Sequence, residues 1–371
     1  MTPDQYSAPV PPVPAVPPVP PGPPPHRPAR RNRRRWVWLG VVLLVVGAPT
    51  GWYFGGGYDR WQDGRSLHGL CGGTVDTTEV RELLDGAGRL SGYEIPSGGG
   101  LANCVLTAPD RSGSLSVTVD WGGSGAYGAM FRLRRTHAVR SEGVPVVPVG
   151  AGWAGVLSAG DDDRADLVLA LSCTGKEADR QLIVSLTADP TKDRDGPKDD
   201  FASGGQRARL GRIGARFAQR ANDIWGCGAR LGGRIEQVPG RADIATVRSG
   251  KADGTCAGVA GPVRESPADG VAPIEDCAVL TPDGSGTVGL RLSAYYPPFT
   301  DQAREGIGLE RGSTGPGTDG SFSWATAKCP GGTVVYLGNR LGPVDAPARD
   351  ALAAFARHSA ERHGCSAPEL P

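Results

Sequence analysis

The residues of this 371-residue chain that come closest to a metal-binding pattern lie near its C-terminus. The chain holds five histidines, at positions 26, 68, 137, 358 and 363. His358 and His363 lie five residues apart and near Cys365, but this separation places two side chains on different faces of a helix. No carboxylate completes a ligand set there. We therefore predict that both histidines lie at a solvated helix end.

Other patterns that serve catalysis or cofactor binding are incomplete. No Gly-x-Ser-x-Gly motif occurs, and the Gly-Lys pairs at 175–176 and 250–251 lack the spacing of a phosphate loop. Residues 161–163 and 189–200 are acidic, and the second stretch resembles a calcium loop, but Ala202 falls where a bidentate glutamate is required. Asp110 and Asp283 lie in Pro-Asp-x-Ser-Gly sequences, in which aspartate bonds its own backbone in a turn. We predict no catalytic, cofactor-binding or metal-binding residue, no cofactor and no enzymatic activity.

Cysteine is the residue type with an informative spacing. The chain has eight cysteines, Cys71, Cys104, Cys173, Cys227, Cys256, Cys277, Cys329 and Cys365. None lies in the first 70 residues. An even number confined to one part of the chain indicates disulfides formed in an oxidising compartment.

The cysteines form two sets of four whose surroundings match. Residues 104–119 align on residues 277–292 without a gap, with five identities and a shared apolar alternation. Before the last cysteine of each set, Phe217 and Phe355 begin a Phe-Ala pair at the same distance from a Gly-Cys pair. We infer that a whole domain is duplicated.

Four cysteines allow three pairings in each copy, so the count alone does not decide between them. Duplication requires each copy to have been self-sufficient, which favours bridges within a copy. Adjacent pairing ties the first helix to the first strand and the last helix to the sheet. The expected disulfides are Cys71 with Cys104, Cys173 with Cys227, Cys256 with Cys277, and Cys329 with Cys365.

The periodicity of each copy predicts an α+β domain. Asp76 and Glu79 fit a capping box before a short helix. Apolar runs at 167–171 and 182–186, and at 322–327 and 334–337, each predict a hairpin. A closing helix follows in both copies, with inward stripes at Leu210, Ile213, Phe217, Ala221 and Ile224 in the first, and at Leu352, Phe355 and Ala356, after a cap at Asp345, in the second. We expect an antiparallel sheet of about four to six strands with helices on one face.

An uncharged apolar stretch precedes the cysteine-bearing part. Residues 36–58 carry no charge, and as a helix they reach about 34 Å, enough to cross roughly 30 Å of hydrocarbon. A cleaved signal peptide, including one of the twin-arginine type, is the alternative, but Pro49 occupies the candidate cleavage site. Six arginines between residues 27 and 35 place the N-terminus in the cytoplasm. We expect a single-pass membrane protein with its C-terminal domains outside.

The flanks of this stretch allow two further interpretations. Residues 1–35 hold thirteen of the 33 prolines. They fit a disordered spacer better than a ligand for a proline-binding groove, although both remain open. Gly47, Gly51 and Gly55 recur every four residues, which suits a weak homodimer, or simply loosens the outer end of the span.

The cysteine placement resembles that of uncharacterised cell-envelope proteins of actinobacteria, such as Streptomyces. In that family a cysteine precedes the first helix and another begins the next strand, as Cys71, Cys104, Cys256 and Cys277 do here. The arginine-rich, lysine-poor composition agrees, with five lysines among 40 basic residues. Many members are lipoproteins, whereas this chain has an apolar span and two copies. The resemblance implies an envelope location and no reaction.

These observations predict six segments. They are an arm (1–35), a transmembrane helix (36–58), a juxtamembrane segment (59–70), copy 1 (71–228), a linker (229–254) and copy 2 (255–366). Residues 59–371 hold 34 basic and 38 acidic side chains, which argues against nucleic acid as a partner. We expect an envelope protein that binds an envelope component or a membrane protein. The alternatives are signalling or assembly through the arm, and an envelope hydrolase whose catalytic acids are not recognisable.

Overall fold

The computed structural model describes residues 36–41 and 57–371, except residues 74, 85, 97–99, 111–112, 134–145, 160–163, 175–176, 179, 190–200, 202, 241–242, 310–314 and 345–346. The chain divides into two units, Met1–Gly55 and Gly56–Pro371. In the first unit, residues 36–41 are helical. Among the described residues, no helix combines the length and apolarity needed to cross a membrane. Residues 42–56 of the expected span, with Gly47, Gly51 and Gly55, and the arm at 1–35 lie outside the described residues.

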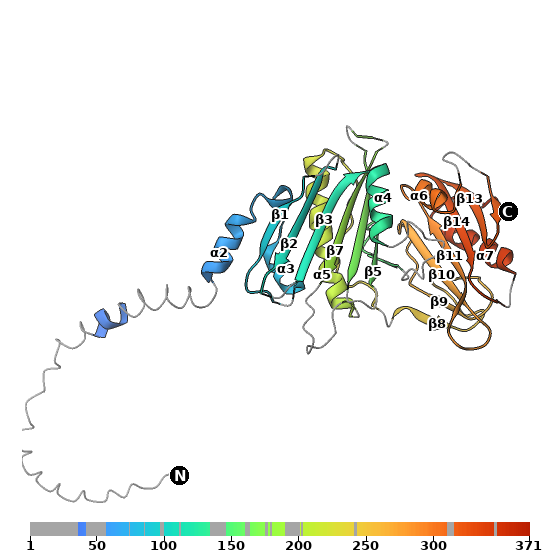
Figure 1. The fold of residues 1–371 in the computed structure, drawn as a ribbon, viewed down its shortest axis with the longest axis horizontal. Helices are drawn as coiled ribbons and strands as arrows, with labels where there is room; N and C mark the ends of the chain where they lie inside the picture. The colour runs from blue at the N-terminus through green and yellow to red at the C-terminus, as the bar shows by residue number, and fades with distance from the viewer. Residues whose placement is uncertain are drawn as a thin grey trace, which may run out of the picture. The chain divides into compact units, whose positions relative to one another are not determined.

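The first half of the second unit is built on a seven-stranded antiparallel sheet of order β1-β2-β3-β7-β6-β5-β4 (Figure 1). Its strands are β1 (Ser91–Glu94), β2 (Ala102–Ala108), β3 (Gly113–Trp121), β4 (Val147–Pro148), β5 (Gly155–Ala159), β6 (Ala165–Ser172) and β7 (Gln181–Asp189). Its helices are α2 (Gly57–Ser66), the 3-10 turn η1 (Leu70–Gly72), α3 (Thr77–Leu83), α4 (Gly122–Arg132) and α5 (Gly204–Ile224).

The second half has its own seven-stranded antiparallel sheet, of order β12-β13-β14-β11-β10-β9-β8. Its strands are β8 (Ala245–Val247), β9 (Val263–Glu265), β10 (Ile274–Leu280), β11 (Val288–Tyr295), β12 (Gly317–Asp319), β13 (Phe322–Cys329) and β14 (Gly332–Arg340). Its helices are α6 (Thr300–Gly306) and α7 (Ala348–Arg362).

The two sheets share one topology. When the outermost strands β4 and β8 are set aside, β1-β2-β3-β7-β6-β5 matches β9-β10-β11-β14-β13-β12 position by position. The helices match too, because α4 and α6 follow the equivalent strands β3 and β11, while α5 and α7 close the two halves. This common order supports the duplication inferred from the sequence. We call the first half, from α2 to α5, repeat 1, and the second half, from β8 to α7, repeat 2.

The four disulfides have the expected pairing. Cys71 is bonded to Cys104 and Cys173 to Cys227 in repeat 1. Cys256 is bonded to Cys277 and Cys329 to Cys365 in repeat 2. Each bridge therefore lies within one repeat, which confirms the argument from self-sufficient copies.

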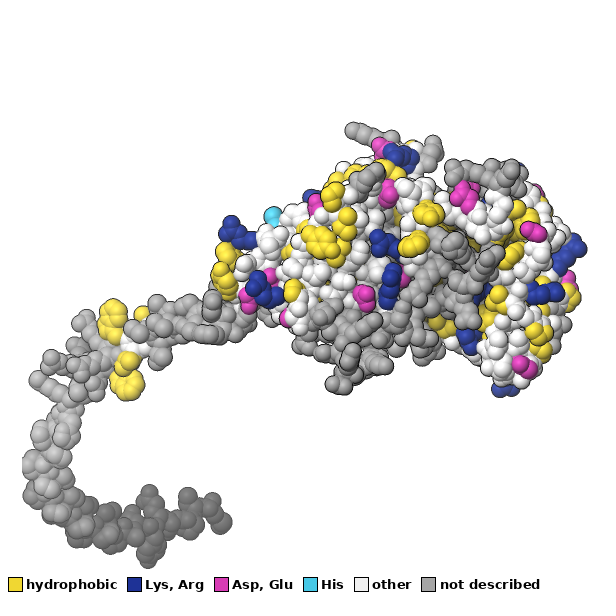
Figure 2. Space-filling model, in the orientation of Figure 1, with side chains coloured by type: hydrophobic (Ala, Val, Ile, Leu, Met, Phe, Trp, Pro, Cys, Tyr) yellow, Lys and Arg dark blue, Asp and Glu magenta, His cyan; other side chains and the backbone are white. Residues whose placement is uncertain are grey.

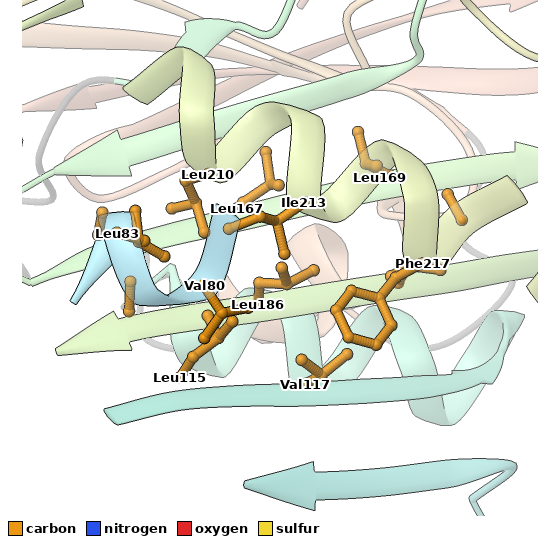
Figure 3. Close-up of a cluster of buried hydrophobic side chains, with 14 of the residues drawn as sticks. Val80, Leu83, Leu115, Val117, Leu167, Leu169, Leu186, Leu210, Ile213 and Phe217 are labelled. Atoms are coloured by element: carbon orange, nitrogen blue, oxygen red, sulfur yellow. The ribbon is translucent and has the colours of Figure 1, made fainter. Parts of the chain in front are cut away.

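The main core of repeat 1 lies between its sheet and α5. Figure 3 shows Leu210, Ile213 and Phe217 of α5 above the leucines of β6 and β7, with α3 beside them. Ile224, expected to continue this stripe, is the last residue of α5 and is 43% exposed. In repeat 2 the expected stripe at Leu352, Phe355 and Ala356 is fully buried. The expected cap at Asp345 was wrong, because α7 begins at Ala348 with Pro347 at its N-cap and no side-chain cap; Asp345 itself lies outside the described residues.

The expectation of helices on one face and of about four to six strands was wrong. In β6, Leu167 and Leu169 join the α5 core, while Val168 and Ala170 join a separate cluster with α4. Strand β6 is thus covered on both sides, which explains its unbroken apolar run at 167–171. The strands that the sequence did not predict are short and lie at or next to the edges of the sheets.

The gapless alignment of the two copies holds at the cysteines but not in the following strand. Cys104 pairs with Val117 across the first hairpin, whereas Cys277 pairs with Leu292 across the second. Gapless alignment would put Leu290 opposite Cys277. A longer turn and an irregularity at Val279 and Leu280 shift the second strand by two residues. The shift is even, so the same face stays buried.

The segment expected as a linker, 229–254, is divided between the repeats. Ile235 and Val238 are buried in the core of repeat 1. Residues 234–239, considered as a strand from sequence, have no regular secondary structure. Strand β8 pairs with β9 and belongs to the sheet of repeat 2.

Candidate binding cleft between the two repeats

The two repeats meet through an apolar cluster to which both contribute. From repeat 1 it contains Met130 of α4 and Ile183 of β7, and from repeat 2 it contains Tyr295 and Phe299, which lead into α6. The backbone N–H of Val146 also donates to a carboxylate oxygen of Asp276 at 3.0 Å. Because α4 and α6 occupy equivalent places, the repeats pack by equivalent faces, in the manner of an isologous dimer.

A cleft of about 650 Å³ opens at this junction, and we call it the junction cleft. Repeat 1 lines it with the start of α4 and the start of β7, through Trp121, Gly122, Gly123, Arg180 and Gln181. Repeat 2 lines it with the equivalent elements, the start of α6 and the start of β14, through Pro297, Pro298, residues 300–302, Arg304 and Thr333. Each repeat thus presents the same two structural elements to one cavity.

The wall from repeat 1 is a helix N-terminus beside an arginine. Trp121 precedes α4 in an extended conformation, and no side chain caps the helix. The guanidinium of Arg180 lies 3.9 Å from the ring centroid of Trp121 and bonds Glu177 at 2.6 Å. These contacts hold Arg180 across the start of α4.

Glycine is required where α4 approaches the sheet. A Cβ on Gly125 would lie only 2.9 Å from the Cβ of Ile183. A larger residue would push the helix away from β7 and change the shape of the cleft. The glycines of α4 therefore serve close packing although they weaken its helix propensity.

The wall from repeat 2 is held by side-chain hydrogen bonds. The hydroxyl of Thr300 donates to the carbonyl oxygens of Tyr295 and Thr333, at 3.1 and 2.8 Å. Gln302 Nε2 donates to the carbonyl oxygen of Gly123 at 3.3 Å, which joins the two walls. Arg304 is only 4% exposed. Burial lowers the pKa of Arg304, and Asp301 opposes that effect.

The described lining of the junction cleft holds few titratable groups. Among the described lining residues, Arg180 and Arg304 are the cations and Asp301 is the carboxylate, with no histidine, cysteine, lysine or tyrosine. General acid–base catalysis needs a group that titrates near the working pH, and nucleophilic catalysis needs an activated nucleophile. The lining offers hydrogen-bond donors, an aromatic ring and two guanidinium groups, of which that of Arg180 is paired with Glu177.

The prediction that His358 and His363 both lie at a solvated helix end was partly wrong. His363 does not lie at a solvated helix end. Its ring stacks on Tyr296 with centroids 3.8 Å apart, and its Nε2 lies 3.3 Å from a carboxylate oxygen of Glu275. His358 is exposed, as predicted, and lies against Gly258. The described residues contain no group of three or more potential metal ligands.

Glu275 is the centre of a buried polar cluster in repeat 2. Glu275 is 2% exposed and accepts hydrogen bonds from Ser359 at 2.6 Å and Arg362 at 3.0 Å. Burial pushes the pKa of Glu275 up, but the contacts with His363 and Arg362 outweigh it and hold the pKa below its ordinary value. Ser359 is fully buried and also bonds the Tyr296 hydroxyl at 2.7 Å. The cluster therefore ties α7 to the sheet.

The two turn aspartates behave differently. Asp283 accepts from the backbone N–H of Ser285 at 3.0 Å, as expected. Hydrogen bonds from Thr281 and Ser285 lower the pKa of Asp283 to about 2. Asp110 instead accepts from the N–H of Gly88 at 2.7 Å, a contact that links the turn to a distant segment. The acidic stretch at 161–163 and residues 190–200 of the calcium-like stretch lie outside the described residues.

Sequence reasoning missed the junction cleft. Its lining comes from four short segments that no single motif joins. One signal was present: Gly122-Gly123 follows β3 directly, and Pro297-Pro298 follows the equivalent strand β11 after one residue. Breaks of this kind mark points where backbones approach each other or a ligand.

The comparisons with known proteins gave no relatives. No protein-family model matches the chain, and no curated protein or solved structure matches it significantly.

Proposed function

We propose that the protein is a single-pass membrane-anchored binding protein of the cell envelope, and that its ligand occupies the junction cleft. The observation that carries this proposal is the construction of one cleft from equivalent elements of two repeats. Pockets at the interface between domains are common ligand sites, and a volume of 650 Å³ is typical of a small-molecule site.

The location rests on two lines of argument. The uncharged stretch at 36–58 and the arginines before it favour an anchor with its N-terminus in the cytoplasm. Four disulfides favour an oxidising compartment for residues 71–365. The envelope of an actinobacterium, implied by the cysteine resemblance, satisfies both.

The surface supports binding in the cleft over binding of a long polyanion. On the face shown in Figure 2, the coloured acidic and basic side chains are interspersed over the folded part. A nucleic-acid site needs cations gathered in a stripe or patch. We therefore propose a small ligand or an envelope component and no nucleic acid.

One contact favours signalling as a second candidate. Asp63 of α2 is 1% exposed, forms an ion pair with Arg81, and accepts from the N–H of Leu90 at 2.9 Å. These contacts of Asp63 fasten α2 to repeat 1. In the chain, α2 follows the apolar stretch. A change in repeat 1 therefore has a direct connection toward the membrane and the proline-rich arm.

Photocrosslinking in living cells tests the binding proposal. A benzoylphenylalanine replaces Thr333, which lines the cleft, and in a matched control it replaces Arg340, which is exposed at the other end of the same strand. We expect an adduct of defined mass from position 333 and none from position 340. Absence of an adduct at 333, or the same adduct from both positions, would overturn the proposal.

A further inference from the structure

We infer that the junction cleft binds a small hydroxylated organic anion, through its carboxylate or phosphate group. This inference rests on the proposed binding function and adds the chemical class of the ligand. Three observations at the cleft support it, and they come from different elements of the two repeats.

The first observation is the exposed start of α4. The helix has eleven residues, no side-chain cap and no acidic residue in its first turn, and Gly122 and Gly123 line the cleft. The free N–H groups of a helix N-terminus carry partial positive charge and bind oxyanions. With no side chain on these two residues, an anion can approach the backbone closely.

The second observation is a pair of arginines from opposite walls. Arg180 comes from repeat 1 and Arg304 from repeat 2. The carboxylates near them are Asp301 of the lining and Glu177, which forms an ion pair with Arg180 at 2.6 Å. Guanidinium groups bind carboxylate and phosphate through paired N–H donors. Arg304 is 4% exposed, so an anion beside it meets a cation that water screens little.

The third observation is an acceptor that calls for a hydroxyl or amine on the ligand. Gln302 donates across the cleft to Gly123, but among the described residues its buried Oε1 has no hydrogen-bond donor. A buried acceptor without a partner is unfavourable by about 1 to 3 kcal/mol. Because this Oε1 is also closed off from solvent, a ligand hydroxyl reaches and satisfies it once the Gln302 side chain turns toward the cleft, whose volume accommodates a molecule of sugar size.

Titration of the full-length protein in detergent tests the ligand class. The probes are glycerol 3-phosphate with glycerol as its neutral control, and glucuronate with glucose as its neutral control. We expect at least one anion to bind at least tenfold more tightly than its neutral control, with affinity that falls as salt is added. The two pairs distinguish a phosphate from a carboxylate. Equal binding of anion and neutral control in both pairs, or no binding of either anion, would overturn the inference.

Substitutions at Gly123 give the sharpest test, because a Cβ there meets no atom within 4 Å. Gly123→Asp puts a carboxylate at the helix N-terminus, where it favours the helix but competes with the ligand anion. We expect G123D to lose at least tenfold in anion affinity while its thermal stability is kept or raised. Gly123→Asn, of nearly the same shape, keeps the affinity within about threefold. Equal effects of both variants on affinity would contradict an anion site.

A second pair of variants checks the arginine. Arg180→Gln shortens and neutralises a side chain in the cleft, whereas Arg340→Gln changes an exposed arginine away from it. We expect R180Q to weaken anion binding about tenfold and R340Q to leave it unchanged. If the cleft crosslinks in cells while R180Q and G123D bind anions as the unaltered protein does, the ligand class is wrong and the binding function stands.

Discussion

At the scale of single residues, a buried polar cluster lies outside the lining of the cleft. Glu275 is buried under α7 with Arg362, His363 and Ser359 around it. A buried carboxylate is tolerated only when it is paired and hydrogen-bonded. The cluster therefore fixes where α7 lies on the sheet of repeat 2.

Glu275→Gln is predicted to destabilise the protein in a pH-dependent way. Removing one partner of a buried ion pair leaves the other uncompensated, so we expect a loss of about 3 kcal/mol near pH 7. The pKa of Glu275 is lowered from 4.5 in the folded state, so its stabilisation is complete above about pH 5 and is lost as the pH falls through the lowered value. Denaturant unfolding of the full-length protein at several pH values measures this.

The control for this prediction is Glu361→Gln, an exposed position on the same helix, which should leave stability unchanged. A difference between Glu275→Gln and the unaltered protein that stays constant from pH 7 to pH 3 would contradict a charged Glu275.

Single-residue roles were the least predictable from sequence. His363 read as a surface residue because its partner Glu275 lies 88 positions away and no local pattern joins them. Disulfide pairing was predictable because the duplication supplied a constraint beyond the cysteine count. Asp283 was predictable because a turn aspartate bonds its own neighbours, whereas the contact of Asp110 with Gly88 depends on the tertiary fold.

At the scale of elements, the helix after the apolar stretch is fastened to repeat 1 through Asp63. Its partners are Arg81 in α3 and the N–H of Leu90 just before β1. One carboxylate thus joins α2 to two other segments. The exposed face of α2 carries Trp61, half-exposed, with Arg65 over its ring.

Asp63→Ala is predicted to release α2 without unfolding the sheet. Removing the buried carboxylate leaves Arg81 without this ion-pair partner and removes the hydrogen bond from Leu90. We expect a local loss of about 3 kcal/mol in stability. Amide exchange in residues 57–66 should accelerate at least tenfold, while β6 and β7 remain protected. Asp59→Ala is the matched control, because Asp59 is partly exposed and, within the described part of the chain, its ion pair with Arg89 is long, at 3.8 Å. Unchanged exchange in α2 of the Asp63 variant would show that other contacts hold the helix.

The elements with strong periodicity were predictable and those that depend on contacts were not. The two hairpins and helices α5 and α7 follow from apolar runs and stripes. Helix α4 was missed because its sequence, GGSGAYGAMFR, is rich in glycine, which disfavours helix in isolation. Its formation depends on burial of Ala126, Ala129 and Met130. Strands such as β4 and β8 are too short to carry an alternation.

At the scale of the whole folded unit, the repeats are joined without a covalent bond between them other than the chain. Their disulfides are internal, and their junction is the apolar cluster around Phe299. The same packing forms the cleft. The stability of the junction and the shape of the cleft are therefore coupled.

Phe299→Ala is predicted to loosen repeat 1 although the residue belongs to repeat 2. Phe299 is fully buried, and its truncation to alanine should lower the free energy of unfolding by about 3 to 5 kcal/mol. We expect faster amide exchange in α4. Phe355→Ala removes an equally buried ring from the other core of repeat 2 and should leave α4 protected. If α4 is protected equally in both variants, the junction does not couple the repeats.

The most direct test of a ligand held between the repeats is amide exchange of the full-length protein with and without saturating glycerol 3-phosphate or glucuronate. Binding in the junction cleft predicts slower exchange in two segments at once, residues 122–125 of repeat 1 and residues 299–304 of repeat 2, for at least one of the two anions. Protection in only one repeat, or no protection in either segment with both anions, would contradict a site shared by the two copies.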